Sequence, residues 1–113
     1  MNIKETMQQL GLGLNGALAY TGARPLYKEE STKEHDGRIA FNVNGKRGYK
    51  WVQEVKLEWN DTYTITLTSV RGTKIKELNK RKNVYCDELQ EYFENMYDLA
   101  IREHNSGMIH FGV

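Results

Sequence analysis

The stretch YKWVQEVKLEWNDTYTITLTSV, residues 49–70, decides the fold because its large apolar side chains recur at every second position. Such alternation is typical of β-strands that bury one face and expose the other. Two strands are therefore predicted, over residues 49–59 and 62–70. The residues predicted to face the core are Tyr49, Trp51, Gln53, Val55, Leu57, Trp59, Tyr63, Ile65 and Leu67. The residues predicted to face solvent are Thr62, Thr64, Thr66 and Thr68.

The loop between these strands fixes which residues pair. Partners on neighbouring strands share a face, so the two apolar sets must meet. A two-residue loop at Asn60 and Asp61 would place Trp59 opposite the polar Thr62, whereas a loop over 60–62 keeps the faces matched. The three-residue loop is therefore predicted. Its pairs are Trp59 with Tyr63, Leu57 with Ile65, and Val55 with Leu67.

Two more strands are predicted beside this pair. Residues 38–43 alternate in the same way, with Ile39, Phe41 and Val43 on one face. A loop over 44–46 matches the faces here, and a shorter turn with a bulge at Gly48 is the alternative. The pairs predicted for this loop are Phe41 with Tyr49 and Ile39 with Trp51. A turn at Arg71 and Gly72 leads into a weaker strand over 73–79, which carries Ile75.

Helical spacing marks both ends of the chain. Residues 2–10 are predicted to form a short helix capped by Asn2, and residues 28–37 to form a polar loop. Residues 17–27 fit either a continued helix or a short strand. A C-terminal helix is predicted over 86–104 from an apolar stripe at helical spacing. The stripe consists of Leu89, Phe93, Met96 and Ala100.

The ends of the C-terminal helix are predicted from capping signals. Asp87 and Gln90 resemble a capping box, and residues 105–107 are expected to stop the helix. The tail over 108–113 alternates again, so it is expected to add an edge strand, to pack back on the sheet or to reach a neighbouring subunit.

These elements predict an α+β fold, with an antiparallel three- to four-stranded meander packed by a C-terminal helix and a short N-terminal helix. The 113 residues are expected to form a single domain, 1–113. Within it, 1–36 hold the N-terminal helix and loop, 37–80 the sheet, 86–104 the helix and 108–113 the tail. The sequence has neither a signal-peptide core nor an apolar run of about 18 residues, which predicts a cytoplasmic protein with no membrane span.

Signals for catalysis are weak. Residues 11–16 match GxGxxG, but a dinucleotide site needs a strand before that loop, and a helix is predicted there. The three histidines have no local ligand spacing. Cys86 opens the C-terminal helix, where a small buried thiol is the ordinary role and an activated nucleophile the alternative. No catalytic residue, cofactor or metal is predicted, and an enzyme using Cys86 is the third hypothesis.

Charge is distributed unevenly along the chain. Residues 71–82 hold six cations against Glu77, a net charge of +5, and residues 87–103 hold six acidic residues against Arg102, a net charge of −5. The whole chain has a net charge of only +1. The residues predicted to bind a nucleic acid or a protein partner are Arg71, Lys74, Lys76, Lys80, Arg81 and Lys82. The alternative role of these cations is to keep an edge strand from aggregating.

The second half of the chain has a recognisable pattern of residues. EVKLEWNDTYTITLTSVRG and NVYCDELQEYFENMYDLAI, within residues 54–101, carry a hairpin at 60–63 and a helix opening at 84–89. In these features residues 55–101 resemble a loose group of small uncharacterised phage and mobile-element proteins. The resemblance implies a small viral or mobile-element accessory protein, and it transfers no activity.

The leading function hypothesis is a non-enzymatic accessory protein that docks on a host or viral protein. Opposite charge blocks on one chain can meet in a symmetric pair, so a homodimer is expected. The alternative is a nucleic-acid-binding protein that uses the basic hairpin 71–82.

Overall fold

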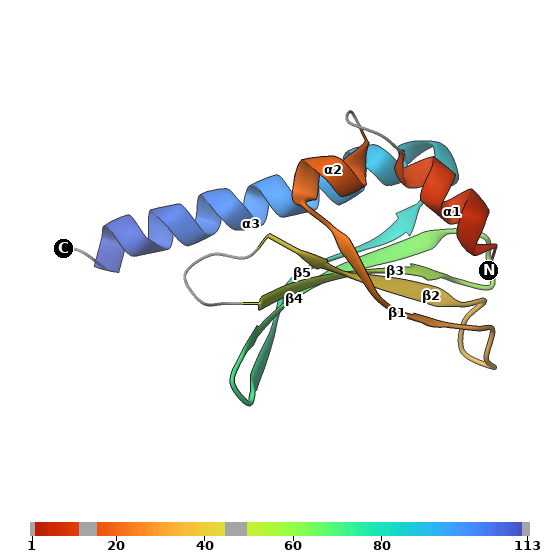
Figure 1. Cartoon of the computed structure of the whole chain (residues 1–113), viewed down its shortest axis with the longest axis horizontal. Helices are drawn as coiled ribbons and strands as arrows, with labels where there is room; N and C mark the ends of the chain where they lie inside the picture. Colours follow the sequence, from red (N-terminus) through yellow and green to blue (C-terminus); the bar gives the residue numbers. More distant parts are fainter. Residues whose placement is uncertain (1, 12–15, 45–49, 112–113) are drawn as a thin grey trace.

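The computed structural model describes residues 2–11, 16–44 and 50–111, and for Ile3 and residues 103–111 the backbone alone. The described strands form one antiparallel sheet in the order β1-β2-β3-β4-β5, and the helices lie on one of its faces (Figure 1). The predicted α+β fold is confirmed, with five strands among the described residues in place of three to four. The elements are α1 (Ile3–Leu10), α2 (Ala17–Thr21), β1 (Arg24–Glu29), β2 (Arg38–Val43), β3 (Lys50–Leu57), β4 (Tyr63–Arg71), β5 (Lys74–Val84), the 3-10 helix η1 (Cys86–Glu88) and α3 (Leu89–Phe111).

The N-terminal segment supplies the strand that sequence patterning did not resolve. Asn2 caps α1 as predicted, because its side-chain oxygen accepts the Glu5 N–H at 3.1 Å. The ambiguous stretch 17–27 is both helix and strand, since α2 ends at Thr21, with Gly22 as its C-cap, and β1 begins at Arg24. Gly22 adopts a left-handed φ of 65°, and a Cβ there would collide with the side chain of Asn44. β1 is an edge strand whose side chains do not alternate between buried and exposed. A search for apolar residues at every second position therefore could not find it.

The predicted pairing of β3 with β4 has the correct faces but is shifted by two residues. Leu57 pairs with Tyr63 and Val55 with Ile65, so the connection runs over 58–62 and the predicted loop over 60–62 is wrong. The side chain of Asn60 folds the longer loop by accepting the N–H of Thr62 at 3.2 Å and its hydroxyl at 2.7 Å. All three predicted pairs are therefore wrong, whereas the shared face of the two strands is confirmed.

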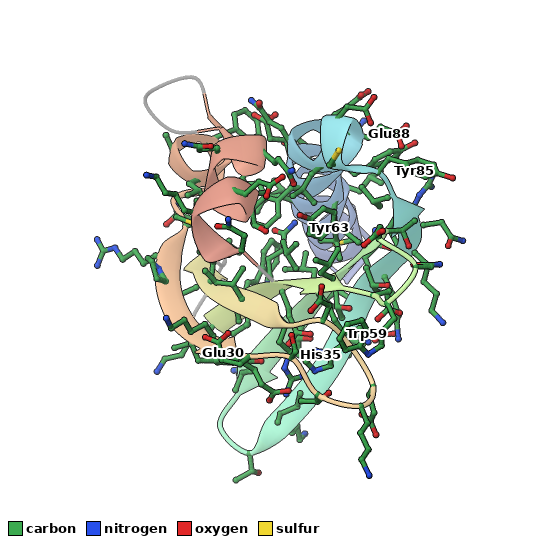
Figure 2. All side chains as sticks on the ribbon, turned by 90° about the vertical axis from the view of Figure 1, so that its right-hand side faces the viewer. Glu30, His35, Trp59, Tyr63, Tyr85 and Glu88 are labelled. Carbon is green, nitrogen blue, oxygen red and sulfur yellow. The ribbon has the colours of Figure 1, made fainter. Side chains whose placement is uncertain are left out.

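The shift follows from the position of Trp59. This side chain was expected in the core, but 57% of it is exposed. Its indole N–H donates to the carbonyl of Thr32 at 3.2 Å, which places it beside the loop that carries His35, whereas Tyr63 points inward (Figure 2). Two of the threonines expected in solvent are also misplaced, because Thr62 and Thr64 are buried. Thr66 and Thr68 are half-buried, because the strands on both sides of β4 shield its short side chains.

The other two connections also differ from the prediction. Ile39 pairs with Val55 and Val43 with Trp51, so the pairs predicted from a loop over 44–46 are wrong. Tyr49 and Gly48 lie outside the described residues. The last turn is displaced by one residue, since Arg71 pairs with Lys74 and the turn consists of Gly72 and Thr73.

The core lies between α3 and the sheet, as predicted. The helix stripe of Leu89, Phe93, Met96 and Ala100 is buried. Phe93 packs edge-on against Phe41 of β2, with 5.9 Å between ring centroids. Gln53 is fully buried and donates its amide to the Phe93 carbonyl at 2.8 Å, which ties the helix to the centre of the sheet. The predicted strand residues that are buried here are Trp51, Gln53, Val55, Tyr63, Ile65 and Leu67, whereas Leu57 is half-buried.

Both ends of the C-terminal helix differ from the prediction. The 3-10 turn η1 precedes α3, and the Tyr85 N–H donates to the Glu88 carboxylate at 3.3 Å, so the predicted capping box at Asp87 and Gln90 is wrong. The helix continues to Phe111, so neither the stop at 105–107 nor an extended tail over 108–111 forms. One glycine costs a helix only about 1 kcal/mol, which the remaining residues can absorb. Residues 112 and 113 lie outside the described residues.

Candidate functional site

The predicted binding residues lie on one two-stranded ribbon at the edge of the sheet. We call Arg71, Lys74, Lys76, Lys80, Arg81 and Lys82 the basic hairpin; all six side chains are exposed. Five of them lie on β5, which has only one neighbouring strand, β4. The turn between the strands curls away from α3 (Figure 1). Gly72 at the turn has a φ of 61°, and nothing lies within 4 Å of a Cβ built there, so the tip is narrow and uncrowded.

The cations of the basic hairpin are divided between the two faces of the ribbon. Partners across strands share a face, and Lys76 pairs with Ser69 and Arg81 with Ile65, on the face that α3 covers. Lys80 pairs with Thr66, on the opposite face, which we call the open face. A bulge at residue 78 makes this division, because it shifts the register between Glu77 and Asn79. Both faces of the ribbon therefore carry lysine, and the open face also carries Glu77, which pairs with Thr68 next to Lys80.

The four lysines of the basic hairpin lie outside the ion pairs of the described structure. Among the described residues, Lys74, Lys76, Lys80 and Lys82 form no ion pair. Arg81 instead lies over the ring of Tyr92 on α3, 4.5 Å from its centroid, and donates to the Tyr92 hydroxyl at 3.3 Å. Arg81 therefore packs against the helix, whereas the lysines are directed at solvent.

The described acidic side chains of α3 form no ion pair with these lysines. Asp98 lies beside α2, where it accepts the Tyr20 hydroxyl at 2.7 Å, and this hydrogen bond raises the pKa of Tyr20. Burial raises the pKa of Glu94, with the charge of Asp98 adding to the effect. At Asp98 and Glu94, the acidic block of the sequence therefore remains separate from the basic hairpin in the fold.

The edge of β5 is protected by its backbone as well as by its charges. Two register shifts interrupt the pairing with β4, and Asn83 adopts a left-handed φ of 59°. The side chain of Asn79 accepts the N–H of Lys80 at 2.8 Å. Bulges of this kind already hinder the addition of another strand. Edge protection therefore does not by itself account for the concentration of cations.

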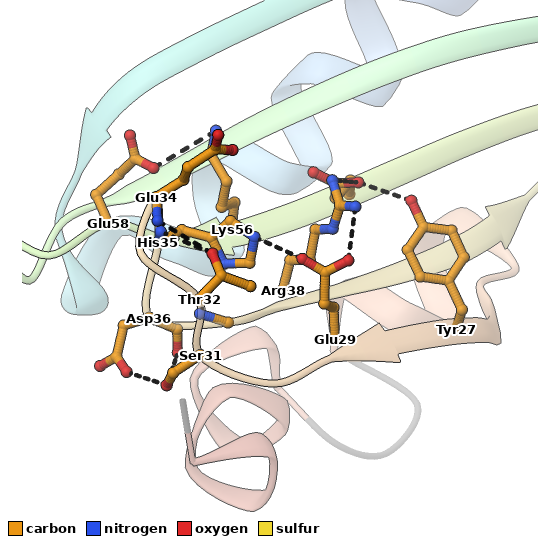
Figure 3. Close-up of polar contacts among 12 residues, drawn as sticks. Tyr27, Glu29, Ser31, Thr32, Glu34, His35, Asp36, Arg38, Lys56 and Glu58 are labelled. Atoms are coloured by element: carbon orange, nitrogen blue, oxygen red, sulfur yellow. Dashed lines mark hydrogen bonds and ion pairs between the residues drawn. The ribbon is translucent and has the colours of Figure 1, made fainter.

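A second charged group lies on the open face at the opposite edge, and we call Tyr27, Glu29, His35, Arg38 and Glu54 the Arg38 cluster. Arg38 donates to Glu29 at 2.9 Å and lies 3.6 Å from Glu54 (Figure 3). The Tyr27 hydroxyl donates to Glu54 at 2.8 Å. His35, which is buried, contacts the other oxygen of Glu29 at 2.8 Å. Every charged member of this cluster has a partner of opposite charge or a hydrogen bond.

The hydrogen bonds of the Arg38 cluster fix its electrostatics. The hydrogen bond from Arg38 holds the pKa of Glu29 below its usual range, with a smaller contribution from His35. Partial burial and the hydrogen bond to Glu54 raise the pKa of Tyr27. The Gly37 N–H donates to Nδ1 of His35 at 2.9 Å, which leaves the proton of a neutral ring on Nε2, facing Glu29. Both ring nitrogens are occupied, so the cluster anchors the loop over 30–37.

Sequence patterning did not find the Arg38 cluster. Its members come from β1, β2, β3 and the loop over 30–37. They meet only because β1 pairs with β2, and β1 gave no strand signal. The one hint in the sequence was the density of ionisable residues between 27 and 38, which also suits a solvated loop.

The remaining sequence candidates do not assemble into a site. Cys86 is exposed, so the expectation of a buried thiol is wrong, and His35 cannot serve as its base because its ring nitrogens are engaged elsewhere. Residues 12–15 of the GxGxxG match over 11–16 lie outside the described residues. The helix α1 precedes this match, whereas a dinucleotide site needs a strand there. The described part of the chain holds no group of three His, Cys, Asp or Glu residues that could bind a metal ion.

A shallow groove runs between α2 and the strands β1 and β2, and its only ionisable lining residue among those described is Arg24. Within the described ranges, no helix combines the length and the apolar character needed to cross a membrane.

Comparisons with protein-family models, with curated proteins and with solved structures found no match. The resemblance to small phage and mobile-element proteins therefore stays a prediction.

Proposed function

We propose that this is a non-enzymatic binding protein whose ligand is a nucleic acid, contacted by the basic hairpin. The observation that carries the proposal is the exposure of lysines on both faces of one ribbon, none of which forms an ion pair in the described structure, although Glu77 lies beside Lys80 on the open face. A flat acidic protein surface can contact only one face of a ribbon. A nucleic-acid groove has phosphates along both of its walls, and β-ribbons enter both the major and the minor groove of DNA.

Binding driven by these lysines should depend steeply on salt. Each phosphate neutralised releases counterions, which gives a slope of about −0.9 in a plot of log affinity against log salt for a DNA duplex. The test is fluorescence anisotropy with labelled duplex and single-stranded DNA and RNA over a range of salt concentrations. Absence of any nucleic-acid binding at low salt would contradict the proposal.

A pair of charge reversals makes this test specific. The variant Lys76→Glu/Lys80→Glu changes one exposed lysine on each face of the ribbon. We expect it to weaken binding at least about tenfold, for all sequences alike. The matched control is Lys28→Glu/Lys33→Glu, which makes the same charge change at exposed residues near the opposite edge. An equal loss in the control would show that net charge, and not the basic hairpin, determines binding.

Docking on a protein partner, the leading hypothesis from the sequence, is the second candidate. It is favoured by the open face of the sheet, where the half-buried Val52 and Val70 accompany the exposed Ile75. Poly-glutamate is a suitable probe for an acidic protein surface. If it competes as well as duplex DNA at equal salt, protein docking is preferred to nucleic-acid binding.

A homodimer, a cytoplasmic location and a phage or mobile-element origin belong to the same proposal. Support for the dimer comes from α3, whose C-terminal turns extend past the sheet (Figure 1). A second copy could cover these turns. Size-exclusion chromatography with light scattering tests this, and a monomer at micromolar concentration would exclude the dimer. The location and origin rest on the sequence features already given.

A further inference from the structure

We propose that the basic hairpin binds double-stranded DNA in the minor groove and inserts Ile75 between two base pairs as an apolar wedge. This inference rests on the proposed function and deepens it, because it names the form of the nucleic acid and the residue that distorts it. It rests on the position of Ile75, on the cations near it and on the absence of aromatic residues from residues 71–84.

Ile75 is the most exposed large apolar side chain of the described structure, with 74% of its surface accessible. A single exposed apolar residue is ordinary on a protein surface. The position of this one is unusual, because Ile75 lies next to the narrow turn and between Lys74 and Lys76 in the chain, although those two side chains project from the other face of the ribbon. A wedge needs an apolar tip to enter the stack and nearby cations to hold the phosphates, and here Lys74 and Lys76 would hold them from the opposite face of the ribbon.

The neighbours of Ile75 on the open face extend the same pattern. Ile75 pairs with Val70, and Val70 pairs with Lys50, so one cross-strand row holds an exposed cation, an aliphatic residue and the wedge. The next positions of β4 on this face are Thr68 and Thr66, which are β-branched but polar. An isoleucine at position 75 is therefore not required by strand geometry, because threonine suits the same strand and face.

The composition of the ribbon favours duplex over single-stranded ligands. Proteins that bind single strands stack the bases on aromatic side chains. Residues 71–84 contain no aromatic residue, so the ribbon offers no such platform. An isoleucine cannot stack like an aromatic ring, but it can separate two stacked base pairs and bend the duplex.

The experiment uses a duplex of about 30 base pairs, roughly three helical turns, with a fluorescence donor and acceptor at its ends. We expect the wild-type protein to raise energy transfer by bending the DNA. We also expect it to bind a duplex with one central mismatch about tenfold more tightly than a matched duplex, because a mismatched step is easier to unstack. Ile75→Ala should lose the bend and the mismatch preference while its salt slope stays unchanged. The control Leu26→Ala truncates an exposed apolar residue on the other edge strand, and it should behave like wild type.

The outcomes separate the wedge from the proposed function. If Ile75→Ala bends DNA and prefers the mismatch as wild type does, Ile75 is not a wedge. Binding without bending or mismatch preference by the wild-type protein overturns the wedge and leaves nucleic-acid binding intact. Failure to bind any nucleic acid at low salt overturns both.

Discussion

Arg38 on β2 and Lys80 on β5 project from the same face of the sheet into opposite surroundings. Arg38 lies within 4 Å of two carboxylates, those of Glu29 and Glu54. Lys80 pairs across strands with Thr66, and on its other side the described sheet ends. The environment of each cation follows from the residues on neighbouring strands. The charges of the Arg38 cluster therefore contribute to folding, and the lysines of the basic hairpin are available to a ligand.

The two regions also differ in how they constrain the chain. The Arg38 cluster joins β1, β2, β3 and the loop over 30–37 through hydrogen bonds. The basic hairpin is built from local β-pairing and a two-residue turn, and Arg81 contacts α3 through its side chain. Substitutions in the first region should therefore change stability, whereas those in the second should change binding. The four predictions below test this division, from the largest expected effect to the smallest.

Replacing Arg38 by leucine should lower the free energy of unfolding by about 2 kcal/mol, because it removes hydrogen bonds to charged groups and leaves Glu29 and Glu54 without their shared cation. The partial exposure of Arg38 keeps the effect below that of a fully buried pair. Lys80→Leu is the matched control, and it should change stability by no more than about 0.5 kcal/mol. Guanidinium denaturation measures both. Equal losses in the two variants would remove the distinction between the regions.

Replacing His35 by alanine should cost about 1.5 kcal/mol. The variant loses the hydrogen bond to Glu29 and leaves the N–H of the buried Gly37 without its acceptor. The loop over 30–37 should also become more sensitive to limited proteolysis. Lys33→Ala is the control, because Lys33 lies in the same loop and is exposed. If His35→Ala is as stable and as resistant to protease as Lys33→Ala, the cluster does not anchor the loop.

The Arg38 cluster should make stability depend on pH in the acid range. Hydrogen bonds from Arg38 and His35 hold the pKa of Glu29 below the ordinary value of 4.5. A carboxyl whose pKa is lower in the folded state stabilises the fold above its unfolded pKa, and this contribution is lost as pH falls through the folded value. The stability difference between wild type and Glu29→Gln should therefore shrink as pH falls from 6 to about 3. The difference for the exposed neighbour Glu30→Gln should stay constant, and parallel curves for the two variants would contradict the prediction.

The sequence predicted those parts of the fold in which burial alternates regularly. β2, β3, β4 and the stripe of α3 each present one apolar face, and that periodicity is visible in the letters. The same regularity could not fix register, because moving a strand by two residues keeps every face unchanged. The choice between the pairs Trp59 with Tyr63 and Leu57 with Tyr63 depends on whether Trp59 stays in the strand. That depends on Thr32, which lies 27 positions away in the chain.

The two candidate sites also differ in whether the sequence could predict them. The basic hairpin could be predicted because its cations lie close together in the sequence, within residues 71–82, and share one turn. The Arg38 cluster could not, because it depends on β1, an exposed edge strand that contains a proline and has no alternating pattern. The division of the lysines between two faces was equally hidden, because it is produced by a bulge at residue 78 that no sequence signal marks.

The smallest predicted effect is a change in the free energy of unfolding, and its sign tests whether the lysines of the basic hairpin stabilise the fold. Lys76→Gln/Lys80→Gln removes two like charges from a block with a net charge of +5, so the free energy of unfolding should stay unchanged or rise by a few tenths of a kcal/mol, roughly the size of surface charge effects. Any gain should disappear at about 1 M salt, where the Debye length is about 3 Å, whereas the loss in Arg38→Leu should largely persist because that site is partly buried. Denaturation at low and high salt measures both effects. A loss of stability near 1 kcal/mol would mean that these lysines have partners that hold the fold, and the basic hairpin would then belong with the Arg38 cluster as a structural device.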